Sequence, residues 1–172
     1  QWRWRCNDRI RDWVPDARFG IVTTGKAHLD LMEALRLLGI DEGECRRIGI
    51  DIYKIGMVWP LDRRDALAFM RGKREVLVVE EKRGIVESQF KEYFYDWPGA
   101  KPERMVGKHD ENGERLIPWT GELSPRLLAP IVAKRLDGVF PGLNLSERAA
   151  RLVPGADRVI QVAGASRTPY FC

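Results

Sequence analysis

The most restrictive feature of this sequence is a run of four apolar residues, Val76 to Val79, with no polar residue inside it. A continuous run of this kind, rich in branched side chains, is typical of a central parallel strand that is covered on both faces. The run passes directly into a charged loop over residues 80–84. We therefore expect a sheet that carries helices on both faces, with a charged loop at the end of its central strand.

Strand and helix patterns alternate along the rest of the chain. Phe19 to Thr23 has the composition of a buried strand, and Ala27 to Leu38 carries apolar residues at helical spacing before Gly39. By the same criteria we expect a strand within Arg47–Gly56, helices over Arg63–Arg71, Ile85–Tyr95 and Ser124–Leu136, a hairpin-like excursion within Met105–Trp119 and a small helix after Ser146. This alternation predicts a mostly parallel sheet.

The chain has 172 residues, of which 44% are hydrophobic, and this is enough for one compact core. We predict a linker or docking arm over residues 1–16, an α/β domain over 17–165, and the start of a further linker over 166–172. The tryptophans of the first segment either mark a partner surface or fold back onto the domain. They are Trp2, Trp4 and Trp13.

The three cysteines, Cys6, Cys45 and Cys172, are too few and too widely spaced for a disulfide framework or a self-contained zinc site. This favours a reducing, cytoplasmic setting. No run of about 18 apolar residues is present, and the amino terminus lacks the apolar region of a secretory signal. The expectation is a soluble protein without a membrane partner.

The net charge of +4 arises from 29 basic and 25 acidic residues, which are interleaved almost everywhere. We interpret this as solvated surface, because a nucleic-acid-binding module more often shows a basic stripe with interleaved aromatic residues and a recognisable signature. No nucleic-acid partner is expected. A basic nucleic-acid-binding module is kept as a rival hypothesis.

The segment Gly20 to Lys26 matches most of a phosphate-binding loop. Two features count against that function. Ala27 stands where a magnesium-coordinating hydroxyl is required, and residues 21–24 favour a strand where the loop needs free backbone amides. A nucleotide-binding enzyme using the Gly20–Lys26 turn is therefore a second rival, while weak anion or partner binding at Thr23, Thr24 and Gly25 fits the end of a strand.

The two histidines fall on different predicted elements, so they do not form a pair. His28 is expected to be a surface or capping residue. His109 lies beside Asp110 and Glu111, but no cysteine or third ligand stands at a suitable spacing, which favours a solvated loop over a metal or acid–base site. Spacing supports no Ser-His-Asp or Cys-His arrangement.

Glu80 and Glu81 end the strand predicted to be the most buried, where ligands and partners gather in open α/β sheets. Adjacent side chains on a strand point to opposite faces, so the two acids cannot act together as a catalytic pair. Either they pair with Lys82, Arg83 or nearby arginines, or one of them is buried against a basic group of a neighbouring domain.

Four segments, taken in order, resemble a known family. They are Gly20–Ala27, Lys54–Asp62, Val76–Glu81 with Val86–Gln89, and Arg167–Cys172. This succession is similar to the middle region of indolepyruvate ferredoxin oxidoreductase, a member of the 2-oxoacid:ferredoxin oxidoreductase family. Cys172 resembles the first cysteine of a motif that opens the following thiamine-binding region.

The resemblance implies a domain like the carboxyl-terminal domain of transketolase, a three-layer α/β/α sandwich with a mostly parallel, five-stranded mixed sheet. The parent enzyme is expected to decarboxylate arylpyruvates oxidatively, producing an acyl-coenzyme A and reduced ferredoxin. Its thiamine diphosphate, magnesium and 4Fe-4S clusters are expected in other domains. The parent is also expected to be a dimer.

For this chain the resemblance implies a non-catalytic packing and assembly domain that holds no cofactor or metal itself. Its partners are then the other domains of the parent chain. The candidate interdomain contacts are the turns that follow three predicted strands. They are Thr23, Thr24, Gly25, Lys26, Trp59, Pro60, Asp62, Glu80, Glu81, Lys82 and Arg83.

Overall fold

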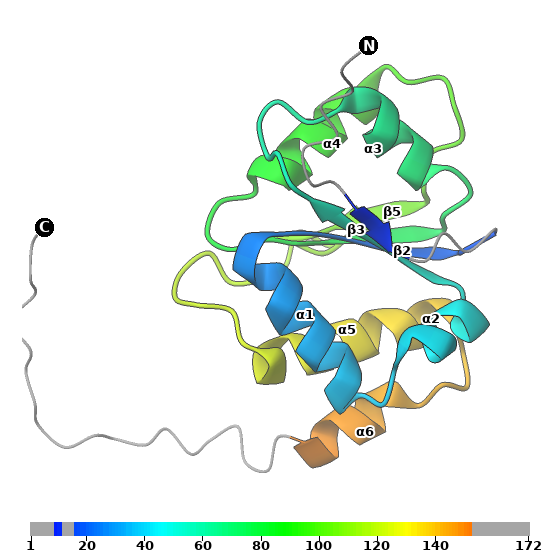
Figure 1. Cartoon of the computed structure of the whole chain (residues 1–172), viewed down its shortest axis with the longest axis vertical. Coiled ribbons are helices and arrows are strands. Elements are labelled where there is room, and N and C mark those ends of the chain that lie inside the picture. Colours follow the sequence, from blue (N-terminus) through cyan, green and yellow to red (C-terminus); the bar gives the residue numbers. More distant parts are fainter. Residues whose placement is uncertain (1–8, 12–15, 153–172) are drawn as a thin grey trace, which may run out of the picture.

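A computed structural model of the chain describes residues 9–11 and 16–152. In these ranges a five-stranded sheet lies between two layers of helices (Figure 1). The strands are β1 (Arg9–Arg11), β2 (Phe19–Thr24), β3 (Ile50–Ile55), β4 (Glu75–Val79) and β5 (Arg104–Val106). The helices are α1 (Gly25–Leu37), α2 (Glu42–Ile48), α3 (Arg63–Met70), α4 (Ile85–Tyr95), α5 (Pro125–Val139) and α6 (Leu145–Leu152).

Several sequence predictions lie outside the described residues. They concern Trp2, Trp4, Trp13, Cys6 and the segment that ends at Cys172.

The sheet has the order β1-β3-β2-β4-β5. Strands β2 to β5 are parallel to one another, and β1 pairs antiparallel with β3 at one edge. The predicted mixed, mostly parallel sheet is therefore confirmed. The arm predicted over residues 1–16 includes this edge strand, in which Arg9 lies opposite Lys54.

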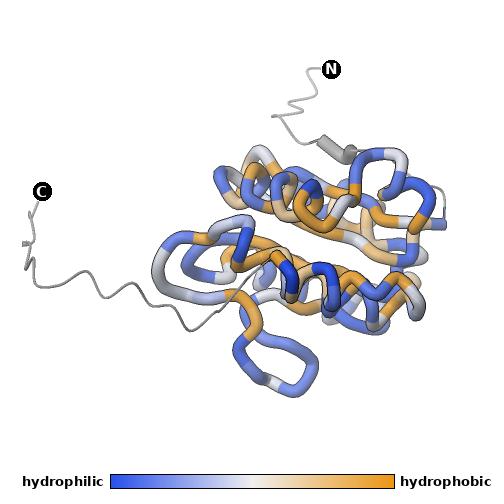
Figure 2. Tube along the Cα trace, turned by 90° about the horizontal axis from the view of Figure 1, so that it is seen from below, coloured by the Kyte–Doolittle hydropathy of each residue, from blue (hydrophilic) through white to orange (hydrophobic). Residues whose placement is uncertain are grey.

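Two apolar clusters fill the space between the layers. On one face of the sheet α1, α5 and α6 cover the larger cluster, which includes Phe19, Leu31 and Leu136. On the other face α3 and α4 cover the smaller cluster, which includes Phe69 and Phe90. Apolar stretches of the chain lie mainly between the layers in Figure 2, as expected for a sheet buried on both faces.

The strongest sequence signals are confirmed. Every residue of β4 is buried, so the apolar run lies in the interior of the sheet. Asp62 caps α3, with its carboxylate accepting hydrogen bonds from the backbone N–H groups of Arg64 and Asp65 at 2.9 and 3.2 Å. The hydroxyl of Ser124 accepts from the N–H of Leu127 at 3.3 Å and caps α5.

The strand predicted from Arg47 was wrong in its first residues. Helix α2 occupies Glu42–Ile48, capped by Asp41, whose carboxylate accepts from the N–H of Glu44 at 2.8 Å. Gly49 ends the helix with a φ of 91°, in the left-handed region that favours glycine, and β3 starts at Ile50. The capping pattern outweighs the strand tendency of the isoleucines at this boundary.

The predicted excursion within residues 105–119 is confirmed as a hairpin-like loop. After β5, His109 and Arg115 form an antiparallel bridge. Asp110 closes the turn between them, because its carboxylate accepts from the N–H groups of Asn112 and Glu114 at 2.8 and 3.0 Å. The chain then returns past the carboxyl edge of the sheet to α5.

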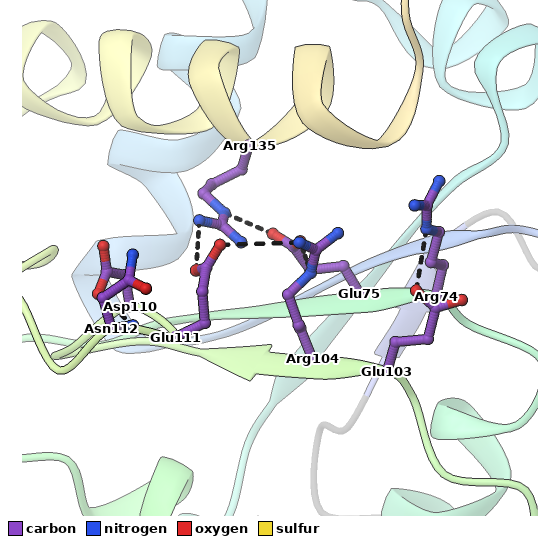
Figure 3. Close-up of polar contacts among 8 residues, drawn as sticks. All are labelled: Arg74, Glu75, Glu103, Arg104, Asp110, Glu111, Asn112 and Arg135. Atoms are coloured by element: carbon purple, nitrogen blue, oxygen red, sulfur yellow. Dashed lines mark hydrogen bonds and ion pairs between the residues drawn. The ribbon is translucent and has the colours of Figure 1, made fainter.

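A buried ion-pair network joins α5 to the amino ends of β4 and β5 (Figure 3). Arg135 Nε lies 2.5 Å from Glu75 Oε1, and Arg104 Nε lies 3.1 Å from Glu75 Oε2. Arg135 Nη1 also donates to Glu111 Oε2 at 2.8 Å. Burial alone would lower the pKa of Arg135, but the hydrogen bonds to Glu75 and Glu111 raise it above its ordinary value.

Replacing Arg135 with methionine should destabilise the fold. The substitution leaves the carboxylate of Glu75, which is 1% exposed, without one of its two cationic partners. Breaking a buried pair costs about 3–5 kcal/mol, and the remaining Arg104 favours the lower end. Urea unfolding of Arg135→Met should show this loss, whereas Arg126→Met, at an exposed position of α5, should stay within about 0.5 kcal/mol. Equal stability of both variants would contradict the role given to the network.

Candidate functional site

The carboxyl ends of β2, β3 and β4 meet at one edge of the sheet because these strands are parallel. The chain leaves β2 through α1 on one face, and it leaves β4 through α4 on the opposite face. Such a reversal opens a crevice between the two strand ends in α/β sheets. A cavity of about 250 Å³ lies there, lined by Thr24, Gly25, Lys26, Ala27, Val58, Glu80, Glu81, Arg83 and Ile85.

This cavity draws on all three turns that the sequence singled out. Residues 24–26 span the end of β2 and the start of α1, Val58 precedes Trp59 in the turn after β3, and Glu80, Glu81 and Arg83 follow β4. Among the candidate contacts Thr23 to Lys26, Thr23 is 1% exposed and lies in the interior. In the turn after β3, Trp59 and Pro60 are exposed, whereas Asp62 is occupied in capping α3.

The Gly20–Lys26 segment forms a strand that passes directly into a helix. Strand β2 continues to Thr24 and α1 begins at Gly25, so residues 21–24 hold the extended conformation that the sequence predicted. Gly20 has a packing role, because a Cβ at this position would press against the side chain of Lys73. Lys73 in turn lies 2.6 Å from Asp51, and both side chains are buried.

Lys26 is engaged within the domain. Its Nζ donates to Asp30 at 2.8 Å and to the carbonyl oxygen of Leu123 at 2.9 Å, and it lies 3.4 Å from Glu81. The hydrogen bond to Asp30, together with the attraction of Glu81, raises the pKa of this ammonium. The lysine therefore acts as a link between α1, the end of β4 and the segment before α5.

Glu80 lies inside the domain, where it caps a helix. Its side chain is 4% exposed, and its two carboxylate oxygens accept from the N–H groups of Val86 and Glu87 at 2.9 and 3.0 Å. Burial raises the pKa of this carboxyl, against the opposing effect of the two backbone hydrogen bonds. Its carboxylate is therefore used to bind backbone amides of α4, although both Glu80 and Glu81 line the cavity.

Glu81 points to the opposite face, as expected for neighbouring residues at a strand end. Its carboxylate accepts from the N–H of Leu123 at 3.3 Å and pairs with Lys26. The prediction that the two acids diverge is therefore confirmed. The basic partner of Glu81 is Lys26, from α1, whereas the sequence had suggested Lys82, Arg83 or a nearby arginine.

Lys108 is a buried residue that sequence reasoning missed. It is 2% exposed, and its Nζ donates to the carbonyl oxygens of Glu80 at 2.6 Å and Pro118 at 3.1 Å. Its own N–H donates to Glu87 Oε2 at 2.8 Å. Burial lowers the pKa of Lys108, although Glu80 and Glu87 act in the opposite direction. The residue holds the 107–123 loop against the end of β4.

Gln89 is a second residue that the sequence did not reveal, and it positions the turn after β3. From α4 its side-chain amide donates to the carbonyl oxygen of Val58 at 2.7 Å and accepts from the N–H of Leu61 at 3.0 Å. The only signal was its place in the family-like segment Val86–Gln89. The two hydrogen bonds fix the turn that exposes Trp59.

A larger hollow of about 800 Å³ adjoins the cavity, and the two share Glu81, Arg83 and Ile85. Its far side is formed by Trp119, Thr120 and Gly121. His109, predicted to lie in a solvated loop, stands edge-on to Trp119 with 5.8 Å between ring centroids. His28 is 4% exposed in α1, so the surface position expected for it was wrong.

Apolar side chains gather at this edge. Across the described part of the chain seven large hydrophobic side chains are exposed, and five of them lie in the segments just discussed. They are Met57, Val58, Trp59, Ile85 and Trp119. Val58 and Ile85 line the cavity together, and Ile85 and Trp119 line the hollow together, so at least these three lie near one another. Exposed apolar patches often mark interaction sites.

The polar groups of the described residues are not arranged for metal binding. In residues 9–11 and 16–152 no three His, Cys, Asp or Glu side chains lie close enough together to hold a metal ion. None of the helices in these ranges combines the length and apolar character that a bilayer crossing requires.

Comparison with known proteins gives a consistent result. Residues 11–153 match the family described as "Indolepyruvate oxidoreductase domain". The chain is 28% identical over 164 residues to indolepyruvate oxidoreductase subunit IorA of Thermococcus kodakarensis, covering 94% of this chain and 22% of that protein. For IorA of Pyrococcus horikoshii the identity is 32% over 139 residues, covering 79% and 19%. The chain thus spans about a fifth of the length of the curated relatives it matches.

Two solved structures are also similar to this chain. One is a 2-oxoglutarate:ferredoxin oxidoreductase from Magnetococcus marinus, with a TM-score of 0.47 and 18% identity over 76% of this chain and 20% of that one. The other is a split-gene transketolase, with a TM-score of 0.48 and 17% identity over 75% of this chain and 41% of that one.

Replacing Glu80 with glutamine should change how stability depends on pH. Because burial raises the folded-state pKa above the ordinary 4.5, the folded state retains this proton after the unfolded state has lost it. The contribution of Glu80 to the free energy of unfolding is therefore full below pH 4.5 and is lost as pH rises through the folded pKa. Urea unfolding should be measured from pH 4 to 8 for the wild type and for Glu80→Gln. The free energy of unfolding of the wild type minus that of the variant should decline over this range.

Glu92→Gln, at an exposed position of α4, the helix that Glu80 caps, is the matched control. Its difference from the wild type should lack the decline that Glu80→Gln reveals. A difference for Glu80→Gln that rises with pH would contradict the assignment.

Proposed function

The chain belongs to the indolepyruvate oxidoreductase domain family, and we propose that it is a non-catalytic assembly domain that packs against the catalytic domains of its parent enzyme. The observation that carries the proposal is the apolar carboxyl edge of the sheet. Its ionisable residues Lys26, Glu80 and Lys108 are engaged in contacts inside the domain, while Trp59, Ile85 and Trp119 are exposed. Such an edge is better suited to packing against another domain than to catalysis.

In this proposal the parent is a 2-oxoacid:ferredoxin oxidoreductase that oxidatively decarboxylates arylpyruvates to acyl-coenzyme A. The parent enzyme passes electrons to ferredoxin, so this domain is linked to ferredoxin only through the parent. The parent also forms a cytoplasmic dimer with a second copy of itself. The relatives named indolepyruvate oxidoreductase support this assignment of the reaction. Residues 1–16 serve as a docking arm anchored by β1, residues 17–165 as the α/β unit, and residues 166–172 as the start of a linker.

We place the cofactors of the parent in its other domains. A 4Fe-4S cluster normally needs four thiolates, whereas the described part of this chain offers Cys45, which is buried in the core. The described residues also lack an acidic group of three that would hold magnesium with thiamine diphosphate. The chain's own contribution is to position its neighbours, with Glu81, Lys82 and Arg83 and the turns at 24–26 and 59–62 as contacts.

A complementation experiment tests this function. The parent subunit is produced without this domain, the 172-residue chain is added separately, and arylpyruvate-dependent reduction of viologen is followed. The chain alone should show no turnover, and its addition should restore activity with a measurable half-saturating concentration. Removing the large apolar side chain in Trp59→Ser should raise that concentration about tenfold, as loss of a buried contact of about 1.4 kcal/mol would.

Tyr95→Ser is the matched control for this experiment. Tyr95 is 84% exposed at the end of α4, away from the carboxyl edge, so its loss should leave complementation unchanged. Turnover of an arylpyruvate by the isolated chain, or full activity of the parent without it, would overturn the proposed function.

A further inference from the structure

We propose that the hollow between the loop at residues 81–85 and the turn at residues 119–121 receives an acidic polypeptide segment that carries a large apolar side chain. The inference rests on the proposed function, because it names the chemistry of the neighbour that meets the carboxyl edge. The hollow has a volume of about 800 Å³, which is enough to enclose such a side chain and parts of its flanking backbone.

The walls of the hollow are apolar. Ile85, the first residue of α4, is 48% exposed on one side, and Trp119 is 46% exposed on the other. An aromatic or branched side chain placed between them would remove both from water. Burial of apolar area contributes about 25 cal/mol per Å², so this contact provides attraction without specificity for charge.

The rim of the hollow is cationic. Lys82 and Arg83 are exposed and, across the part of the chain that the structure describes, neither forms an ion pair. The acid on the rim, Glu81, is already paired with Lys26 and accepts from the N–H of Leu123. Two uncompensated positive charges therefore border the apolar walls, and carboxylates on the incoming segment would complement them.

The backbone of the rim turn is itself unusual. Lys82 has a φ of 53°, in the left-handed region that a lysine seldom adopts. This turn reverses the chain immediately after β4 and places two cations next to each other at the rim. A glycine would form the turn at less cost, so the lysine side chain at this position is consistent with a use outside the domain.

The hollow is preformed. Lys108 binds the carbonyl oxygen of Pro118, and the ring of His109 supports Trp119, so the tryptophan wall is anchored from two sides. Opposite it, the carboxylate of Glu80 caps α4 at the turn that carries Ile85. A surface already held in its binding geometry loses less conformational entropy when a partner arrives.

A polypeptide fits this surface better than a free small carboxylate. Ile85 and Arg83 line both the hollow and the adjoining cavity, which extends to Val58 and thus towards exposed Trp59. The apolar surface therefore continues past the volume that a single ring with one carboxylate would fill. A chain segment could cover the hollow and its apolar extension together.

The test uses the isotope-labelled chain and four probes of defined composition. They are the peptides Ac-GDEFDEG-amide, Ac-GDEGDEG-amide and Ac-GKKFKKG-amide, and the small carboxylate 3-phenylpropionate. Amide and indole resonances are followed by two-dimensional NMR during each titration. The acidic peptide with phenylalanine should bind at least about tenfold more tightly than each other probe, with shifts centred on residues 81–85 and 119–121.

Charge reversal makes the prediction sharper. Arg83→Glu should weaken binding of the acidic phenylalanine peptide about tenfold and strengthen binding of the basic one, because the sign of the rim changes. Arg71→Glu is the matched control, since Arg71 is exposed at the end of α3 and forms no ion pair within the described residues. It should leave the peptide preference as in the wild type, and circular dichroism verifies that both variants are folded.

Equal binding of acidic and basic peptides, equal binding of 3-phenylpropionate, or shifts centred elsewhere would each overturn the inference. These results would leave the complementation by the whole chain intact if the edge docks through apolar contact alone. Failure of complementation, in contrast, overturns the proposed function. The two experiments therefore separate the two claims.

Discussion

The structure depends on the parallel pairing of β2 with both β3 and β4. Phe19, at the start of β2, lies opposite Ile50 on one side and Glu75 on the other. Parallel neighbours cannot be joined by tight turns, so each connection must cross the sheet, and here helices make these crossings. Because β3 and β4 lie on opposite sides of β2, the crossings use both faces. Two covered faces and a crevice at the carboxyl ends follow from this one arrangement.

The two ends of the sheet are held by different chemistry. At the amino ends, buried acids meet buried cations directly, as Glu75 meets Arg135 and Asp51 meets Lys73. At the carboxyl ends, Glu80 and Lys108 bind mainly backbone groups of the loops around them. Burial shifts both pKa values towards the neutral forms, raising that of Glu80 and lowering that of Lys108. The amino end is closed by ion pairs, whereas at the carboxyl end buried polar groups fix loops that expose apolar side chains beside Lys82 and Arg83.

Much of the fold could be predicted because its signals are local. The apolar run before Glu80, the cap at Asp62 and the Ser124–Pro125 start of α5 each depend on a few adjacent residues, and each is confirmed. The family resemblance is also confirmed by the comparisons. At α2 the local signals conflicted, and the last residues of this short helix were taken for the start of a strand.

The site could be predicted only in part, because its decisive contacts join distant segments. The sequence placed the three turns at strand ends, and parallel pairing brought them together. It gave no sign that Lys108 would bind the carbonyl of Glu80, 28 residues away, or that Gln89 would hold the turn at Val58, 31 residues away. Without those partners, the sequence left two interpretations of Glu80 open, a pair with Lys82, Arg83 or a nearby arginine, or burial against a basic group of a neighbouring domain. Because Glu80 is used inside the domain, the proposed contact surface consists of the exposed apolar side chains and of Lys82 and Arg83, which these internal hydrogen bonds hold in place.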